Sequence, residues 1–375
     1  MDFEWTAEEN AAREQVAGLL DAGERGRLAA LEEADGPALC EATLRGFRRL
    51  GGAGYWDAAL GPRDDARTPL RAAMDLELAR ASSSFFLAVQ ATRHAAGLLA
   101  GWGPDDVRAR LLGPLCAGEA VGAVVLPEAG AAADGGPAAT DSGGGSWTLR
   151  GRRPFVANGP IADAVAVFAQ TEDRTLVAFV RPGDAGVRLG PRLRTLGLDG
   201  LATSALELDG ARVPADRVLG PFEDDAARVW CARSRDLGLA IAGVGLMQRA
   251  LGAAKDHAQS HARGGKPLVA RQEVGFKLAE LLTLTQTAEL LVHRAAWMVG
   301  AGEAEAGILV RCAKVFCAES AEKVAGGAMQ VLAGHGCLAG HEVERAWREA
   351  KTLALMGTTV ERSRMAIADE LLARP

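Results

Sequence analysis

The hydrophobic period of this chain changes twice, and the two changes limit what it can fold into. Apolar residues recur at three- and four-residue spacing from Thr6 to about Gly118, the repeat of amphipathic helices. At Val121 the pattern becomes short apolar and β-branched runs separated by Gly, Pro and Asp, which is typical of strands. Helical spacing returns near Asp224. The sequence therefore predicts helices, then a small β domain, then a bundle of long helices.

The helical parts divide into separate segments. We expect helices near residues 6–20, 38–50, 68–81, 84–100, 104–117, 223–262, 267–300, 303–332, 342–355 and 358–373. Thr6 with Glu9 fits a capping box, and Pro104-Asp105-Asp106 fits a first helical turn. Because the later helices are long and joined by short loops, they predict an antiparallel bundle.

The middle of the chain reads as closely spaced strands. The runs are AVGAVVL, SWTLRG, AVAVFAQ, TLVAFV, SALELDG and RVPADRVLG. The Gly/Ala-rich stretch 130–145 is interpreted as a loop or long turn. Such strands predict a barrel or sandwich of about 100 residues. The expected fold is α+β and multidomain: a helical domain over 1–118, a β-barrel over 119–221 and a helical bundle over 222–375.

Composition excludes several classes of protein. The chain has 375 residues, 49% of them hydrophobic, and a net charge of −6 with Lys and Arg scattered singly, so neither nucleic acid nor an anionic membrane is indicated as a partner. Six cysteines without CxxC spacing suggest reduced thiols. No signal peptide is recognisable, and the longest uncharged apolar stretch, Leu237–Met247, is too short to span a bilayer. We expect a cytoplasmic protein.

Three consecutive C-terminal segments resemble a known family. MQVLAGHG (329–336), VERAWREAK (343–351) and GTTVERSR (357–364) follow one another as MQ(V/I)xGGxG, (V/E)RxxRDAK and IYEGT do in acyl-CoA dehydrogenases. A helical domain, then a β-barrel, then a four-helix bundle is also that family's architecture, and the resemblance covers essentially the whole chain. Read alone, the glycines at 334, 336 and 340 also fit an ordinary interhelical loop.

The resemblance implies a position for the catalytic base. Counted without gaps from Arg348, Gly357 stands where the family usually has its catalytic glutamate, next to the substrate. Members with the base elsewhere carry a glutamate and then an arginine near the start of the helix that here reads WCARSRDLGLAIAGVG, and this register gives Arg235 and then Asp236. Asp236 is thus the candidate alternative base and substrate contact. The other interpretation is an acid that serves the helix dipole.

Two segments resemble the family's flavin contacts. VVLPEAGAAAD (124–134) is similar to TEPxAGSD, with Val125 replacing the threonine that meets the flavin, Gly130 matching, and Ala131 replacing the serine beside the thioester. Flavin contacts would then come from main-chain groups, unless this segment is only a strand and turn kept for packing. GRRPFVANGPIADAVAV (151–167) resembles GxKxWITNGxxAD: Phe155 takes the place of the stacking aromatic and Ala157 that of the threonine at the flavin N5 edge.

A fourth segment resembles the family's cross-subunit phosphate clamp. Residues 245–272 are similar to the helix and RxxFGKPL motif, with His261 in the register of the arginine and Arg263 as the nearby guanidinium. Gln330, Gly334 and Thr359 match or lie near further cofactor positions. His257 and His261 have the i, i+4 spacing of metal ligands, but an acidic partner is missing. We interpret them as a solvated helix end and predict no metal site.

The resemblance implies FAD-dependent α,β-desaturation of an acyl thioester, carried by CoA or a carrier protein. A base removes the α-proton and the flavin accepts the β-hydride. Glycine at position 357 leaves three interpretations: a dehydrogenase that uses Asp236 or a partner's residue as base, a non-catalytic subunit of a heteromer, or the same fold used for other chemistry, with or without flavin. We expect a homo-oligomer or heteromer assembled through the bundle, with weak or no activity on straight-chain acyl-CoAs.

Overall fold

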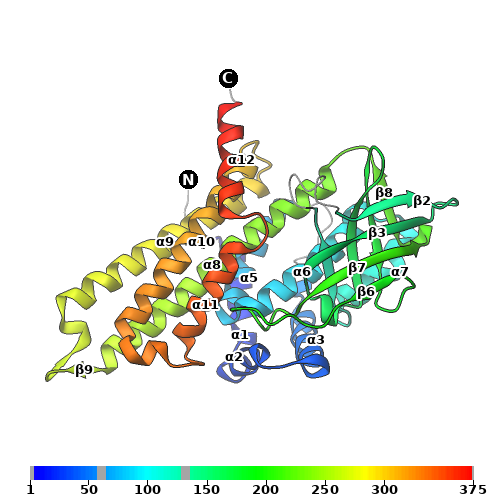
Figure 1. Ribbon diagram of the computed structural model, residues 1–375. Helices are drawn as coiled ribbons and strands as arrows, with labels where there is room; N and C mark the ends of the chain where they lie inside the picture. The colour runs from blue at the N-terminus through cyan, green and yellow to red at the C-terminus, as the bar shows by residue number, and fades with distance from the viewer. Residues whose placement is uncertain (1–3, 57–64, 128–135, 374–375) are drawn as a thin grey trace.

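The computed structural model describes residues 4–56, 65–127 and 136–373. Helices, then a sheet, then long helices follow one another along the chain (Figure 1). The predicted α+β order is therefore confirmed. The strands of the main sheet begin at Gly122 and end at Phe222.

The N-terminal part is helical. Its helices are α1 (Ala7–Leu19), α2 (Ala22–Ala29), α3 (Gly36–Gly52), α5 (Thr68–Ala81), α6 (Ser83–Trp102) and α7 (Asp105–Cys116). The predicted capping box is present, since Glu9 N donates to Thr6 Oγ1 at 3.2 Å and Thr6 N donates to Glu9 Oε2 at 2.8 Å. Helix α2 was not predicted from the sequence. Its segment AGERGRLA contains two glycines, which weaken helix propensity.

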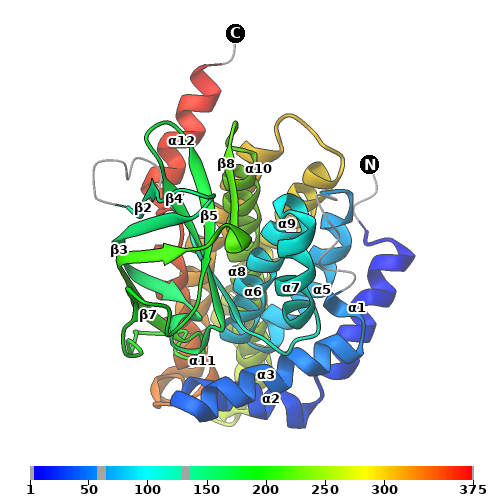
Figure 2. The ribbon, with the colours of Figure 1, turned by 90° about the vertical axis from the view of Figure 1, so that its right-hand side faces the viewer.

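Eight strands form one mixed sheet. They are β1 (Gly122–Val125), β2 (Ala138–Asp141), β3 (Trp147–Ala157), β4 (Ala164–Gln170), β5 (Thr175–Val180), β6 (Val187–Leu189), β7 (Thr203–Val213) and β8 (Val218–Phe222). The order is β6-β7-β3-β2-β4-β5-β8, and β1 pairs with β4 in parallel from Gly122↔Ala164 to Val125↔Val167. The predicted loop at 130–145 is wrong where it includes β2, because this short strand is specified by pairing with β3 rather than by its own Gly-rich surroundings. Helices α3, α6 and α7 lie beside the sheet (Figure 2).

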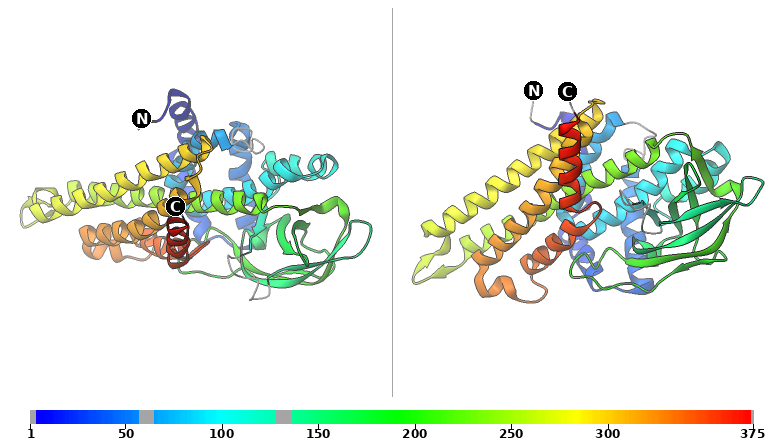
Figure 3. Two further views of the ribbon diagram at one scale, coloured as in Figure 1. Left: turned by 90° about the horizontal axis from the view of Figure 1, so that it is seen from above. Right: turned by 45° about the horizontal axis from the view of Figure 1, so that its top comes forward.

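Long helices make up the C-terminal part. They are α8 (Ala226–Ser260), α9 (Gln272–Gly300), α10 (Ala306–Leu332), α11 (Glu342–Leu355) and α12 (Val360–Leu372), with a small hairpin of β9 (Ala262–Arg263) and β10 (Lys266–Pro267) between α8 and α9. Helices α8, α9 and α10 run side by side away from the sheet (Figure 3). The predicted bundle is confirmed.

Helix α8 is the centre of the fold. It packs against α5, α6, α9, α10 and α11, and its middle is buried almost all round. By length and composition it is the one helix in the described ranges that could cross a membrane, yet 72% of its most apolar window is buried inside the protein. A helix that is apolar on all sides suits such a central position.

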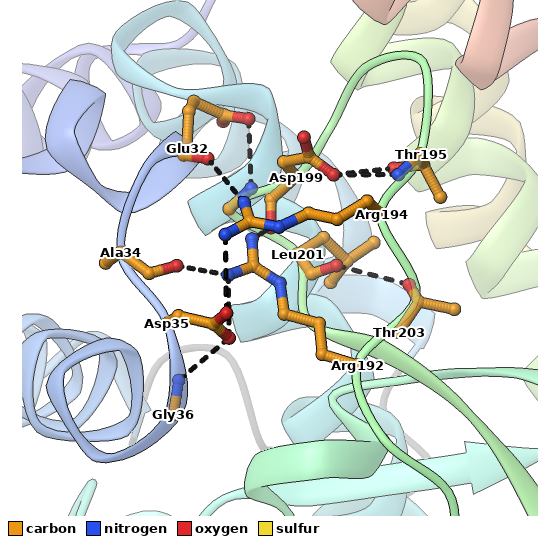
Figure 4. Close-up of polar contacts among 11 residues, drawn as sticks. Glu32, Ala34, Asp35, Gly36, Arg192, Arg194, Thr195, Asp199, Leu201 and Thr203 are labelled. Carbon is orange, nitrogen blue, oxygen red and sulfur yellow. Dashed lines mark hydrogen bonds and ion pairs between the residues drawn. The ribbon is translucent and has the colours of Figure 1, made fainter.

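The segment 190–202 connects the sheet to both helical parts (Figure 4). Buried Arg192 donates to the carbonyls of Ala34 and Asp199, and Gly200 N donates to Glu32 Oε2 at 2.9 Å. On the other side, Arg348 of α11 donates through Nη1 to Leu196 O at 2.7 Å. This segment therefore holds the sheet, the N-terminal helices and α11 in one arrangement.

Candidate functional site

Asn158 joins the end of β3 to β1 and α6. Its backbone is left-handed, with φ 63°, and its side chain is fully buried. Nδ2 donates to Ala88 O at 2.9 Å and to Gly122 O at 3.0 Å, while Gly122 N donates to Thr92 Oγ1 at 3.0 Å. The turn predicted at Asn158-Gly159 is present, and it fixes the ends of two strands against one helix.

The predicted flavin-contact residues in the described part of the chain lie on β1 and on β3, two strands in contact with each other. Val125 is buried at the end of β1, Ala157 is half-buried at the end of β3, and Phe155 is 71% exposed. In the described part of the chain β1 pairs on one side only, with β4, and it lies against β3 on the other. An exposed ring on β3, a strand that contacts β1, together with an unpaired main-chain edge on β1 suits a flat aromatic ligand with polar edges. These residues therefore fit a flavin, whereas predicted contacts Gly130 and Ala131 lie outside the described residues.

The position of the missing glutamate is closed to side chains. Gly357 has φ +66°, and a Cβ placed there would lie 2.8 Å from Leu239 Cδ1 and 2.9 Å from Arg235 Nε. Glycine adopts this left-handed conformation without strain, whereas most residues with a Cβ do not. The space in front of residue 357 is therefore occupied by the Arg235 side chain of α8.

Arg235 belongs to a cluster with Asp236, Lys314 and Thr358, which we call the Arg235 cluster. Arg235 Nε and Nη2 donate to Asp236 Oδ1 at 3.1 and 2.9 Å, and Nη2 also donates to Thr358 Oγ1 at 3.0 Å. Lys314 of α10, 1% exposed, donates to Thr358 O. Burial lowers the pKa of Lys314, an effect that Asp236 opposes. Two cations thus surround one carboxylate.

In the ion pair of Arg235 and Asp236, the guanidinium is more exposed to solvent than the carboxylate. The Arg235 side chain is 22% exposed and that of Asp236 is 9% exposed. Asp236 Oδ1 accepts both of these hydrogen bonds from Arg235, so the guanidinium occupies this carboxylate oxygen. The role of Asp236 as base stays a prediction, and this geometry gives it little support.

A polar cavity lies one helical turn away, between α5, α6 and α8. Its volume is about 40 Å³, room for about one water molecule. It is lined by Asp65, Thr68, Arg71, Ala72, Asp75, Arg93, Gly97, Trp230, Arg233, Ser234, Leu237, Gly238, Ile241 and Val299. Gln90 Nε2 of α6 donates to Ser234 O at 3.2 Å, and a Cβ on Gly238 would lie 1.4 Å from that nitrogen. Glycine at 238 is therefore required for this contact.

Buried charges beside the cavity are paired. Arg93 donates to both Asp75 oxygens, at 2.8 and 2.7 Å, and Tyr55 Oη donates to Asp75 Oδ1 at 2.7 Å. Burial raises the pKa of Tyr55 well above its usual value. His94 Nε2 lies 3.0 Å from Ser234 Oγ, and burial, assisted by nearby guanidinium charges, holds the pKa of His94 well below its usual value. His94 is therefore neutral near pH 7.

The remaining predicted residues fall into two distant groups. Thr359 caps α12, next to the Arg235 cluster, and its Oγ1 accepts from Arg362 N at 3.4 Å. Arg263, Gln330 and Gly334 are exposed. Arg263 belongs to β9, just after the far end of α8 (Figure 1). Gln330 and Gly334 come just before His335, whose ring lies 5.3 Å from that of His257 on α8. At 1.5 Å rise per residue, roughly 38 Å of helix separates Arg235 from Ser260. One chain therefore does not bring the two groups together.

Histidines gather at this far end of α8. The rings of His257 and His261 stack with centroids 3.8 Å apart, and His335 lies 5.3 and 5.4 Å from them. Burial and the neighbouring histidines lower the pKa of His257. In residues 4–56, 65–127 and 136–373, no group of three or more His, Cys, Asp or Glu side chains is arranged to hold a metal ion.

Several residues of the site were missed by sequence reasoning. They are Tyr55, Asp75, Arg93, His94 and Lys314. The available signal was polar residues at helical spacing inside apolar helices, such as Gln90, Arg93 and His94 in FFLAVQATRHAAGLL and Lys314 in ILVRCAKVFCA. A charged residue on a buried helix face needs a partner, but the sequence does not say which.

Comparison with known proteins places this site in a family. Residues 126–211 match the profile described as acyl-CoA dehydrogenase, middle domain, and residues 233–372 match acyl-CoA dehydrogenase, C-terminal domain. The chain is 31% identical over 278 residues to a 3-(aryl)acrylate reductase of Clostridium sporogenes, covering 72% of this chain and 74% of that protein. It is 31% identical over 384 residues to a benzylmalonyl-CoA dehydrogenase of Aromatoleum aromaticum, covering 99% and 100%. The structure of butyryl-CoA dehydrogenase from Megasphaera elsdenii shares the fold, with a TM-score of 0.87, 24% identity and coverage of 99% and 100%. This chain belongs to the acyl-CoA dehydrogenase family.

Proposed function

We propose that this protein is a flavin-dependent oxidoreductase that introduces an α,β double bond into an acyl thioester. The observation that carries the proposal is the exposed ring of Phe155 on β3, a strand that contacts β1, while β1 pairs only with β4 among the described residues. Both strands fall largely within the part of the chain that matches the family's middle domain. Relatives named for benzylmalonyl-CoA and butyryl-CoA support CoA as the carrier. A carrier-protein thioester stays the alternative.

FAD would be held by this chain through one ring contact and several main-chain contacts. Phe155 would stack on the flavin, and the edge of β1 near Val125 would offer N–H and C=O groups to it. Bound FAD supplies the acceptor for the hydride that leaves C3 of the acyl group. Asn158 keeps both strands in position. Ala157 has no hydroxyl, so it provides only main-chain groups.

We further propose that the protein works as an oligomer joined through its bundle. Arg263 follows the end of α8 that points away from the sheet carrying Phe155 (Figure 1), and Gln330 and Gly334 lie near that end, so all three would contact the FAD of a neighbour. Helix α9 carries exposed apolar side chains suited to such a contact, namely Phe276, Leu282, Leu290 and Trp297. A heteromer with a related subunit is the alternative. Two further points stay predictions from the sequence. One is the division into three domains at 118/119 and 221/222, and the other is a cytoplasmic location.

The test is the absorbance of the purified protein between about 350 and 500 nm, where flavins absorb. We expect flavin bands, and we expect Phe155→Ala to weaken FAD binding about fivefold, since a stacked aromatic pair contributes about 1 kcal/mol. Trp347→Ala, which removes an exposed aromatic side chain from α11, is the control and should retain FAD. A protein that takes up no flavin on reconstitution would contradict the proposal, as would a Phe155→Ala variant with unchanged affinity.

A further inference from the structure

The Arg235 cluster lacks a group suited to removing a proton from carbon. Position 357 has no room for a carboxylate, and Asp236 is bound by Arg235. The other acid near Lys314 is Glu361 on the first turn of α12. It is fully exposed, and hydrogen bonds to its own backbone N–H and to Thr359 lower its pKa. Among the described residues in and next to the cluster, each carboxylate therefore already accepts hydrogen bonds from the protein.

The same cluster offers positive charge instead. Arg235 is its most accessible charged group, and Lys314 adds a second cation, for which Asp236 is the buried counterion and Glu361 the exposed one. An ordinary acyl chain carries no charge at C2 or C3, so it gives a guanidinium nothing to bind. A carboxylate matches a guanidinium in both charge and geometry.

Desaturation needs an electron pair at C2, and this pair has two chemical sources. One is loss of a proton, which requires a base. The other is loss of CO2 from a carboxylate on C2, which requires none. In this site the base is missing and a guanidinium occupies its space. Such a site suits loss of CO2 rather than loss of a proton.

We propose that the substrate is a 2-carboxyacyl thioester, a substituted malonyl thioester, and that decarboxylation replaces proton abstraction. This inference rests on the proposed function. Arg235 binds the 2-carboxylate and orients it. The bond from C2 to the carboxylate carbon breaks, CO2 leaves, and the electron pair stays on C2. That pair forms the C2=C3 bond as hydrogen leaves C3 as hydride to FAD.

The overall step balances. The acyl group loses CO2 and a hydride and gains a double bond, and FAD gains the hydride and the negative charge that the carboxylate held. No added proton or further oxidant is needed for this half-reaction. Because Asp236 already accepts two hydrogen bonds from Arg235, the guanidinium orients the substrate carboxylate without fully neutralising it, which leaves CO2 free to depart.

The experiment compares ethylmalonyl-CoA with butyryl-CoA, which differ only in the 2-carboxylate. The FAD-loaded protein is mixed with each under anaerobic conditions, and flavin bleaching, crotonyl-CoA and CO2 are measured. We expect ethylmalonyl-CoA to bleach the flavin and to give crotonyl-CoA and CO2 in equal amounts, and butyryl-CoA to bleach it at least tenfold more slowly. Equal or faster bleaching by butyryl-CoA would overturn the inference, as would bleaching by ethylmalonyl-CoA without CO2 release.

Binding tests Arg235 separately from turnover. Equilibrium titration should show that Arg235→Gln loses about 10- to 100-fold in affinity for ethylmalonyl-CoA, the range for a charge-assisted hydrogen bond, while its affinity for butyryl-CoA is unchanged. Arg235→Lys should recover part of the loss. Since Arg235→Gln leaves Asp236 unpaired, Arg235→Gln/Asp236→Asn is the second variant, and it should show the same loss. Arg228→Gln, at an exposed ion pair with Asp225 on the first turn of α8, is the matched control.

The two proposals fail in distinguishable ways. Absence of FAD, or absence of binding to either thioester, would contradict the proposed function. If the protein takes up FAD, is bleached by butyryl-CoA, and its Arg235 variants bind both thioesters with equal affinity, the proposed function stands. Only the inference that the substrate carries a 2-carboxylate would then be overturned.

Discussion

Replacing Asn158 tests the junction on which the flavin-binding strands depend. Its Nδ2 donates to Ala88 O at 2.9 Å and to Gly122 O at 3.0 Å, and each such bond contributes about 1 kcal/mol net. Asn158→Gly should therefore lower the free energy of unfolding by about 2 kcal/mol. Asn158→Ala should lower it by about 3 to 4 kcal/mol, because at φ 63° a residue with a Cβ and no local hydrogen bond costs about 1 to 2 kcal/mol more.

The assay is urea unfolding followed by circular dichroism at a fixed protein concentration. Asn10→Ala is the control: Asn10 Nδ2 donates to Trp5 O at 2.9 Å on the exposed surface, and its loss should cost under about 0.5 kcal/mol. Equal losses for the Gly and Ala variants of Asn158 would refute the argument from left-handed backbone. A loss under about 1 kcal/mol in both would refute the argument from the two buried hydrogen bonds.

Three further substitutions test other parts of the site. Because burial and Arg93 hold the pKa of His94 well below its unfolded value, the stability that neutral His94 contributes is present above about pH 6.5 and falls by up to about 1.4 kcal/mol per pH unit below it. His94→Gln should lessen the fall in melting temperature between pH 7.5 and 5.5, and an unchanged fall would contradict this pKa. Gly357→Ala should cost about 2 kcal/mol in urea unfolding through positive φ and short contacts, and a neutral result would show that the loop relaxes freely. Arg93→Met should cost about 3 to 5 kcal/mol by leaving Asp75 unpaired, and adding Asp75→Asn should recover part of this loss; no recovery would show that the pair is not the cause.

The hydrophobic period of each segment predicted most of the fold. Helices expected at 68–81 and 342–355 are present as α5 and α11 with the same ends, because each has a clear helical period between recognisable end signals. Strands β4 and β5 likewise match the runs AVAVFAQ and TLVAFV. Short elements such as β2 and β6 were missed because pairing with a distant strand, rather than local composition, specifies them.

The site was predicted less completely, since its chemistry depends on contacts between distant segments. The sequence showed that Gly357 lacks a carboxylate, but not that Arg235 fills its space. Arg235 and Thr358 are 123 positions apart, and their contact arises only when the loop before α12 packs on α8. Lys314 joins them from a second helix, α10. Sequence order alone could not show that two helices and the loop before α12 meet in one place.

The bonds that segment 190–202 makes also limit how the molecule can move. With Arg192 buried against the N-terminal helices and Arg348 bound to Leu196 from α11, the sheet cannot rotate as a rigid body without breaking hydrogen bonds on both sides. Hinged closure of one domain over a ligand is therefore unfavourable, and thioesters would enter through side-chain movement alone. The sheet and the helices should also lose structure in a single calorimetric transition rather than one after another.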